Sequence, residues 1–438
     1  METFSQYIRI YPFDVHVLVY NTINGEVIIF PKDSVSGNKI IGQLDARLKE
    51  YLYKHYFFDC VLPWNKFAER YNSNNRILIS LETFLSCNLS CPYCYQTNNN
   101  HLKVKISENN LDLLYKYIIN IHHKTHFDII VLKILGGEPS LDWSPAEYFL
   151  RKITPFCQSN SIKLDLRIDT NCTNIKPFIT ISGYNSILFT VPLCNKTQHN
   201  KYRHYRNGVG TYDDIIKNIL TLENLPNSRI ILRHNTDSHN IRTFNEYLND
   251  IATSGIHNPI ITPQYTTNPD YGEYENQLTY QGYVDWLSSE CIDCLISHNF
   301  KANIYPRLML DGKCQHWSSY SLKLFSDGKV GACAAHFYDN SNPYLSDIVN
   351  HGCDTIGLYW GGTKQFNLFQ DEECLICPSL FGCAGHYKLP CIKELQLIPC
   401  TPEVNMYLNW QLYFTTIYKH IIAGKQKYLP GLNIKFIE

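Results

Sequence analysis

The chain has 438 residues, enough for two or three domains with cores of their own. Its 39 basic residues balance 40 acidic ones, which argues against recruitment of nucleic acid or of an anionic membrane surface. No apolar run reaches membrane-spanning length and the first residues carry no signal-peptide pattern, so we expect a cytoplasmic protein without membrane contact.

The first segment, residues 1–75, is expected to form a small α+β region of its own. The stretch HVLVYNTINGEVIIF predicts a hairpin around Asn24-Gly25, because this pair favours the tight turn between antiparallel strands. Residues 40–58 follow with the apolar spacing of an amphipathic helix. A strand edge here could capture a leader peptide by adding it to the sheet, and a plain structural cap is an equally weighted alternative.

Residues 76–265 alternate strand and helix patterns, which predicts a parallel sheet and an α/β fold class. We expect this segment to be a partial (β/α)6, TIM-like barrel, with Thr211 as the N-cap of one helix. In such folds the loops after the carboxyl ends of the strands carry the chemistry. The predicted strands cover residues 76–84, 127–135, 163–168, 186–193, 229–233 and 259–263, and the predicted helices cover 108–122, 146–157, a stretch starting at 212, and 241–253.

Residues 266–403 lose this alternation and gain cysteine, glycine and aromatic residues. Of the 17 cysteines in the chain, ten lie from Cys291 to Cys400. A cytosolic chain of this length is not expected to use a disulfide framework, so metal binding or redox chemistry explains them better. We expect an irregular domain held by metal, followed by a helix at about 403–423 and a tail within residues 404–438.

Three thiols are packed into the loop after the first barrel strand, in the sequence SCNLSCPYCY. Cys87, Cys91 and Cys94 follow one another at spacings of four and three. A random order of the same residues would contain this pattern only about 0.03 times, so three unrelated buried thiols are the weaker explanation. A closed zinc site or a complete iron–sulfur cubane takes four protein ligands. Three thiolates therefore leave one coordination position open for chemistry.

A second motif, LGGEPS, directly follows the strand predicted at 127–135. Gly136 and Gly137 allow the backbone to approach a ligand closely, and Glu138 beside exposed carbonyls suits a cationic amine. On its own this motif would indicate a turn with a solvated glutamate. Its place at the same edge of the barrel as the three thiols favours a ligand site instead.

Together these motifs resemble the radical S-adenosylmethionine (SAM) superfamily. The resemblance implies that the cysteines hold a [4Fe–4S] cluster whose fourth iron is chelated by the amino and carboxylate groups of SAM. It also implies that the carbonyls of the Gly-Gly-Glu-Pro motif and the Glu138 side chain receive the SAM ammonium. The family's C-x3-C-x-aromatic-C loop matches Cys87, Cys91, Tyr93 and Cys94, and its GGEP motif matches Gly136, Gly137, Glu138 and Pro139.

Weaker matches to the same superfamily follow the third and fourth predicted strands. The sequence DTNCT resembles a T-N-G-T turn, which places Thr170 and Asn171 at the cofactor and puts Cys172 where glycine is usual. The stretch HNKYRHYRNGVGTY resembles an H-D-x-x-R…G-x-G-T-F segment, which implies that Arg203 faces the SAM carboxylate. The preceding VPLCN departs from the usual S-L-D-G, so the role of that aspartate is not carried over and no catalytic residue is assigned.

The cysteines of residues 266–403 are similar to those of the SPASM domain, which carries two auxiliary [4Fe–4S] clusters. The fourth cysteine of its C-x2-C-x5-C-x3-C block would fall at Tyr387, so Cys391 is the expected stand-in, with His386 as a minor alternative. A further ligand is expected upstream, at Cys294 or Cys291. Zinc held by the same thiolates is the alternative to iron and sulfide. The expected auxiliary ligands are Cys294, Cys314, Cys333, Cys374, Cys377, Cys383, Cys391 and Cys400.

The resemblance also implies an activity: three [4Fe–4S] clusters and SAM would generate a 5′-deoxyadenosyl radical that abstracts hydrogen from a substrate. We expect a ribosomally made precursor peptide as substrate, an intramolecular C–S or C–C cross-link as product, and a flavodoxin- or ferredoxin-type electron donor. A formylglycine-forming maturase of sulfatases is the alternative, weakened because Ala334 and not an aspartate follows Cys333. A non-catalytic zinc-binding interaction protein is the third hypothesis.

Overall fold

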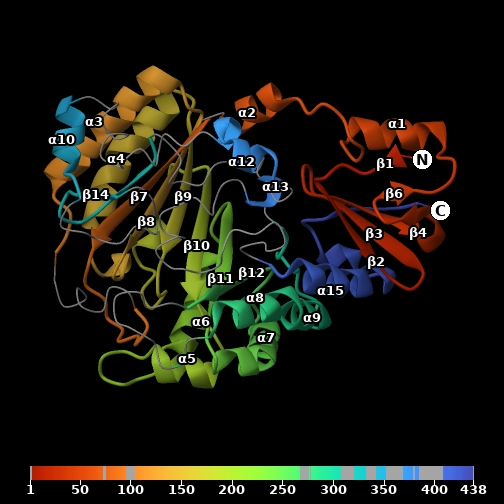
Figure 1. Ribbon diagram of the computed structural model, residues 1–438. Coiled ribbons are helices and arrows are strands. Elements are labelled where there is room, and N and C mark those ends of the chain that lie inside the picture. Colours follow the sequence, from red (N-terminus) through yellow and green to blue (C-terminus); the bar gives the residue numbers. More distant parts are fainter. Residues whose placement is uncertain are drawn as a thin grey trace. The chain divides into compact units, whose positions relative to one another are not determined.

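The computed structural model describes residues 2–72, 75–94, 104–266, 276, 278–306, 320–331, 342–351, 368–377, 380–383 and 408–437 (Figure 1). The chain divides into two compact units. The barrel unit comprises Asn74–Leu278 and Gln315–Gln365, and the terminal unit comprises Met1–Ser73, Thr279–Cys314 and Phe366–Glu438. The terminal unit is thus assembled from three separate stretches, whereas the sequence predicts four consecutive segments.

Six parallel strands form the core sheet of the barrel unit, and each lies where the sequence predicts it. They neighbour one another in chain order, from the first to the sixth, as in a partial barrel. Helices make the crossovers, except between the third and fourth strands, where a loop with one 3₁₀ turn at Phe178–Thr180 connects them. The strands are β7 (Arg76–Phe84), β8 (Ile129–Gly136), β9 (Lys163–Asp169), β10 (Ser186–Pro192), β11 (Ser228–Thr236) and β12 (Ile260–Tyr265).

In the crossover helices, the apolar residues whose spacing predicted a helix are buried. The first begins after Ser107, whose hydroxyl accepts the N–H of Asn110 at 3.2 Å. Thr211 occupies the N-cap position of the helix that starts at Tyr212, as predicted, but its hydroxyl donates to the Arg203 carbonyl and makes no side-chain cap bond. No helix in the described ranges is both long and apolar enough to cross a membrane. The helices are α3 (Glu108–Thr125), α4 (Ser144–Ser159), α5 (Lys196–Tyr202), α6 (Tyr212–Leu222) and α7 (Phe244–Thr253).

Strand β9 shows how the sheet divides its two faces. Its three apolar residues are buried, whereas the charged residues between them are only partly buried. Because successive side chains of a strand point to opposite faces, one face packs under the helices and the inner face carries charge. The inner-face residues of β9 are Asp165, Arg167 and Asp169.

Part of residues 266–403, which the sequence predicts to be irregular, extends the sheet of the barrel unit. Strand β13 (Leu322–Leu324) pairs in parallel with β7, and β14 (Val330–Gly331) pairs antiparallel with β13. The hydroxyl of Ser321 accepts the N–H of Leu78 at 3.0 Å beside this pairing. These strands cover the edge of β7, whose backbone groups would otherwise lack partners. Helix α10 (Leu345–His351) follows.

The terminal unit is built on a four-stranded sheet of order β15-β4-β3-β2. The predicted hairpin is confirmed, with Gly25 in the left-handed region at φ 76° between its two strands. The fourth strand comes from the end of the chain and runs parallel to β4. The strands are β2 (Ile8–Pro12), β3 (His16–Asn21), β4 (Glu26–Pro31) and β15 (Asn433–Phe436), and a small second sheet contains β1 (Glu2–Thr3), β5 (Val35–Ser36) and β6 (Lys39–Ile40).

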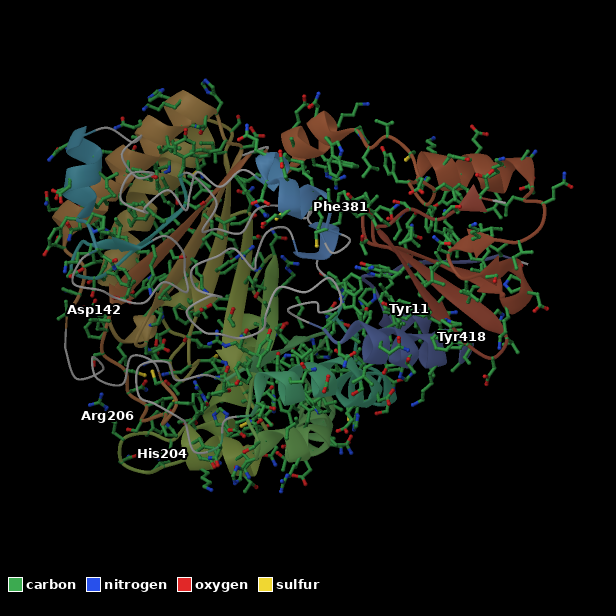
Figure 2. The ribbon with its side chains drawn as sticks, viewed as in Figure 1. Tyr11, Asp142, His204, Arg206, Phe381 and Tyr418 are labelled. Carbon is green, nitrogen blue, oxygen red and sulfur yellow. The ribbon has the colours of Figure 1, made fainter. Side chains whose placement is uncertain are left out.

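Two helices cover opposite faces of the four-stranded sheet (Figure 1). Helix α1 (Ala46–Lys54), shorter than the predicted 40–58 because Asp45 caps its first turn, packs on the face that includes Val19 and Ile28. Helix α15 (Trp410–Ile422) packs on the other face, where Tyr11 stacks on Phe414 at 4.5 Å between ring centroids (Figure 2). It begins later than the predicted residue 403, at the N-cap Asn409, whose side chain accepts the N–H of Leu412.

The N-terminal sheet also packs against the segment that contains Cys374 and Cys377. The Tyr7 hydroxyl donates to the Leu375 carbonyl at 2.8 Å, and its ring meets Phe381 edge-on at 5.0 Å (Figure 2). The terminal unit thus joins the N-terminal strands to the predicted auxiliary ligands through an aromatic core. Its remaining helices are α2 (Trp64–Asn72), α8 (Tyr280–Ser288), α9 (Glu290–Ser297), α12 (Glu372–Leu375) and α13 (Leu380–Cys383).

Candidate active site

A cavity of about 260 Å³ opens at the carboxyl ends of the barrel strands. The loops after β8 and β10 reach this end of the unit, where Figure 2 labels Asp142, His204 and Arg206. The three thiols of the cysteine loop, which we define as residues 85–94, share the cavity with side chains from five strands or their following loops. The lining residues are Cys87, Leu89, Cys91, Tyr93, Cys94, Leu135, Gly136, Gly137, Asp169, Thr170, Asn171, Pro192, Arg203, Arg233, Asn235, Gln264, Tyr265 and Thr266.

The loop after β8 is fastened directly to the cysteine loop by its backbone. The N–H of Gly137 donates to the Phe84 carbonyl at 2.8 Å, and the N–H of Glu138 donates to the Ser86 carbonyl at 2.9 Å. A β-carbon at Gly137 would lie 2.2 Å from the Leu85 carbonyl oxygen, and one at Gly136 would lie 2.2 Å from that of Phe84. These glycines are therefore required by the approach of two backbones, and not only by the approach of a ligand.

Glu138, in the loop after β8, connects the loop after β9 to this loop and to the cysteine loop. It is fully buried and does not line the cavity. One carboxylate oxygen accepts the Thr170 hydroxyl at 2.8 Å and the Ser140 N–H at 3.0 Å, and the other accepts the Asn171 N–H at 2.6 Å. Burial raises the pKa of this carboxyl, and the three donors act against that shift. This placement favours a positioning role for Glu138, so the backbone carbonyls beside it are the better candidates to contact the expected SAM ammonium. Pro139, the next residue, is also buried.

Asn171 connects the loop after β9 to the cysteine loop. Its side-chain amide donates to the side-chain oxygen Oδ1 of Asn88 at 2.8 Å and lies 3.7 Å from the Cys87 sulfur, within the range of an N–H···S bond. Thr173 completes the network by donating to the Asn171 side-chain oxygen at 2.7 Å. Between them Cys172 is buried at φ 62°, a left-handed conformation that explains why glycine suits this turn.

Arg203 supplies a buried cation beside the thiols. It is only 6% exposed, and its Nη1 donates to the Tyr93 hydroxyl at 3.4 Å. Its Nε is buried and has no hydrogen-bond partner within the described ranges. A guanidinium with an unused donor in a cavity is suited to a carboxylate.

Two of the three thiols are buried strongly enough to shift their pKa values. Burial raises the pKa of Cys87 to about 11 and also raises that of Cys91, where Arg203 acts in the opposite direction. The described residues contain no group of three or more Cys, His, Asp or Glu side chains placed to hold a single metal ion. A cubane offers a separate iron to each thiolate, so its ligands enclose a larger volume than those of one ion. Three thiols and an arginine with an unused donor, all lining one cavity, fit a three-cysteine cluster that binds a carboxylate-bearing ligand.

The structure brings together most of the residues that the sequence singled out. The thiols, Tyr93, both glycines, Thr170, Asn171 and Arg203 all line the cavity, whereas Glu138 and Pro139 do not. The sequence analysis missed the polar residues Asp169, Arg233, Asn235 and Gln264. They lie near the carboxyl ends of β9, β11 and β12, so the rule that chemistry follows strand ends could have found them.

The auxiliary ligand set remains a prediction. Cys294 is partly buried on α9, and Cys291 beside it is fully buried. Cys374 and Cys377 are partly buried and lie in the same compact unit as α9. Only the backbone of Cys383 is described, and Cys314, Cys333, Cys391 and Cys400 lie outside the described residues.

Comparisons with known proteins give one distant relative and several similar structures. No protein-family model matches the chain. An uncharacterized protein of Methanocaldococcus jannaschii is 25% identical over 221 residues, which are 45% of this chain and 68% of that protein.

Solved structures of two proteins are similar over most of the chain. AnSMEcpe with bound AdoMet and a Cp18Cys peptide matches this chain with a TM-score of 0.54 at 16% identity. The same protein with a Kp18Cys peptide matches with a TM-score of 0.56 at 17% identity. Each match covers 80% of this chain and 99% of the anSMEcpe chain. Streptococcus suis SuiB bound to S-adenosylmethionine covers 94% of this chain and 99% of its own at 14% identity and a TM-score of 0.44. At these identities the anSMEcpe matches establish a shared fold.

Proposed function

Since this chain has the fold of radical SAM enzymes with a SPASM domain, we propose that it is a radical SAM enzyme that modifies a peptide. The observation that carries the proposal is the single cavity shared by the three thiols, the Gly136-Gly137 backbone and the Arg203 guanidinium. A fold of this kind hosts many reactions, so the argument for function rests on that site.

In this proposal Cys87, Cys91 and Cys94 hold a [4Fe–4S] cluster with one iron left for SAM. When bound, the cluster and SAM would supply a 5′-deoxyadenosyl radical able to abstract hydrogen from an unactivated C–H bond. Arg203 would bind the SAM carboxylate with its unused Nε donor, and the carbonyls of the loop after β8 would accept the ammonium. Glu138 and Asn171 hold the three loops in register, which fixes the thiols relative to Arg203.

A precursor peptide is the proposed substrate, and an intramolecular C–S or C–C cross-link is the proposed product. AnSMEcpe, whose structures contain bound peptides, supports a peptide substrate for this fold. The same likeness favours a second candidate, formylglycine formation, because anSMEcpe is a sulfatase maturase. Ala334 after Cys333 argues for the first, since the sulfatase branch is expected to have aspartate there.

The remaining parts of the proposal concern partners. Two auxiliary [4Fe–4S] clusters would take up an electron from the substrate, and a cytoplasmic flavodoxin- or ferredoxin-type protein would deliver electrons for SAM cleavage. The sheet of the terminal unit is suited to docking a leader segment, because β2 pairs within that sheet only with β3 and so leaves an edge.

Anaerobic reconstitution tests the reaction class. We expect about twelve irons per chain and conversion of SAM to 5′-deoxyadenosine under dithionite, since three cubanes hold four irons each. Cys91→Ala should abolish 5′-deoxyadenosine formation, whereas Cys157→Ala, at a buried thiol on α4, should keep it. A colourless protein that binds zinc and leaves SAM intact would overturn the proposal.

The product is tested by mass spectrometry. The enzyme is incubated with a candidate precursor peptide encoded beside its gene, and in parallel with a sulfatase peptide containing the cysteine that becomes formylglycine. Loss of two hydrogens from the precursor, with no residue-to-residue fragmentation across the linked segment, supports a cross-link. Conversion of the sulfatase peptide alone would favour the second candidate.

A further inference from the structure

Arg233 is a cation in the cavity that the proposed cofactor does not need. It lies on the inner face of β11, since the residues on either side of it, Leu232 and His234, are fully buried on the opposite face. Its guanidinium lines the same cavity as the thiols, and its Nε is buried without a hydrogen-bond partner among the described residues.

No carboxylate in the described part of the chain neutralises Arg233. Asp169 lines the same cavity, but Lys133 occupies it in an ion pair of 2.8 Å. Arg233 is partly buried, and its buried Nε has lost water without gaining a hydrogen-bond partner in the described structure, which is unfavourable for a charged group. A site that keeps such a cation is prepared for an anion.

The inner face of the sheet is basic below the cavity as well. The pKa of Arg167 is lowered, first by its burial and then by the neighbouring charge of Arg76, with Arg229 adding to the effect. Asp165 and Asp169 act in the opposite direction. Three arginines against two aspartates give this stretch of the inner face a net positive charge, which favours an anionic ligand.

SAM does not supply that anion. It carries one carboxylate, which must lie next to the cluster because it chelates iron there. Arg203 is the cation placed for it, since Arg203 bonds Tyr93 of the cysteine loop and interacts electrostatically with Cys91. Arg233 lies on a different strand, where its backbone pairs with the end of β10 at Pro192.

We propose that Arg233 binds a carboxylate of the substrate, so that the enzyme selects peptides with an acidic group close to the modified position. Asn235 and Gln264 line the cavity beside it and provide amides suited to hydrogen bonds with a peptide backbone. The inference rests on the proposed function and makes it more specific. The carboxylate could belong to an Asp or Glu side chain or to the peptide C-terminus.

Three short probes distinguish these sources in the SAM-loaded holoenzyme. They are acetyl-Gly-Asp-Gly-amide, its Asn counterpart, and acetyl-Gly-Asn-Gly with a free C-terminus, titrated by anaerobic calorimetry. We expect the Asp probe to bind about tenfold more tightly than the Asn probe, as for a charge-assisted pair. Tight binding of the free-carboxylate probe instead would assign Arg233 to the C-terminus.

Variants then locate the effect. Arg233→Gln should abolish the preference for the carboxylate probe, and Arg233→Lys should retain part of it. Arg229→Gln is the matched control, because it removes the same charge from the same face of β11 at an exposed position far along the strand. SAM affinity and 5′-deoxyadenosine formation without probe are measured on each sample, and Arg229→Gln should leave both as they are in the wild type.

Two results would overturn the inference. Equal binding of the Asp, Asn and free-carboxylate probes by the wild type would show that no carboxylate is recognised. Weaker SAM binding by Arg233→Gln, with the preference among probes intact, would assign Arg233 to the SAM site. A wild type that prefers the carboxylate probe but never cleaves SAM would overturn the proposed reaction and leave the anion site standing.

Discussion

A single side-chain amide ties the loop after β9 to the thiol expected to bind iron. Asn171 donates toward the Cys87 sulfur at 3.7 Å and toward Asn88 at 2.8 Å. Hydrogen bonds to a cluster sulfur stabilise its more negative, reduced form and so raise its potential. One residue can therefore set both the position of the thiol and the reducing power of the centre.

Asn171→Ala should lower the midpoint potential of the SAM-binding cluster by about 40 mV, taking about 1 kcal/mol for the hydrogen bond and 59 mV per tenfold change. A redox titration followed by electron paramagnetic resonance measures it. Asn174→Ala is the control, since that amide bonds the Ser140 carbonyl and no thiol. An unchanged potential in Asn171→Ala, with the cluster fully assembled, would contradict the assigned role.

His234 gives the barrel unit a dependence on pH. It is fully buried between Phe244 and Tyr247, and burial lowers its pKa to about 3. In the unfolded chain this histidine binds a proton near pH 6.5, whereas in the folded chain it stays neutral. The contribution of neutral His234 to the free energy of unfolding is therefore complete above pH 6.5 and is lost as the pH falls from 6.5 toward 3. His234→Phe should remove about 1 kcal/mol of the stability loss between pH 7.5 and 5.5, because the unfolded histidine no longer takes up a proton.

The urea midpoint at the two pH values measures this effect. Thr253→Ala, at an exposed position on α7 that carries no titratable group, should leave the pH dependence as it is in the wild type. A His234→Phe variant that loses stability over this interval as steeply as the wild type would contradict the assignment.

Among the elements, the junction between the loop after β8 and the cysteine loop is the most tightly constrained. Gly137→Ala would place a β-carbon 2.2 Å from the Leu85 carbonyl oxygen, so one of the two backbones must move. We expect a loss of about 2 kcal/mol in unfolding free energy and a sharp loss of iron incorporated at the cysteine loop. Leu141→Ala, on the same loop at a side chain that is 42% exposed, should be nearly neutral in both measurements.

The elements that were predictable from sequence are those whose stability is local. The six barrel strands and the helix over 108–122 follow from apolar periodicity, and the Asn24-Gly25 turn follows from backbone preference. Tertiary contacts decided the exceptions. The Thr211 hydroxyl donates to the Arg203 carbonyl and so makes no side-chain cap bond at α6, and the three residues of β13 are too few to show a period before β7 offers them an edge.

The residues of the candidate site also fall into two groups, those that the sequence predicts and those that only the folded structure reveals. Spacing was enough to predict that the three thiols and the two glycines come together, because those motifs are continuous in sequence, and they line one cavity. The ligand contact of Glu138 stays a prediction, and the structure adds that its oxygens accept hydrogen bonds from Thr170, Asn171 and Ser140. Arg233 could not be distinguished from other strand arginines, because only the folded sheet shows that none of the described carboxylates forms an ion pair with it.

At the scale of the whole molecule, β4 near the start of the chain and β15 near its end depend on each other. β15 pairs in parallel with β4, and the Ile437 N–H extends the pairing to the Ile29 carbonyl at 2.9 Å. Removal of residues 431–438 should lower the stability of the terminal unit by about 3 kcal/mol, since it unpairs several backbone groups and uncovers the β4 edge. Thermal unfolding and light scattering measure the stability and the expected aggregation.

Graded variants test the cause. Ile437→Pro removes one donor and should cost about 1 kcal/mol, whereas Val61→Ser, at a side chain that is 98% exposed, should cost almost nothing. A truncated chain as stable as the full one would show that β15 does not support the sheet.

This pairing has a consequence for synthesis on the ribosome. The β2–β4 strands emerge first, yet their sheet cannot be completed until the last residues leave the exit tunnel. The six parallel strands β7–β12, by contrast, can pair once their own continuous stretch has been translated, and only the edge of β7 waits for β13. While the middle of the chain folds, the apolar strands β2–β4 are therefore exposed with the edge of β4 unpaired. A chaperone that prevents aggregation would be needed most during this interval.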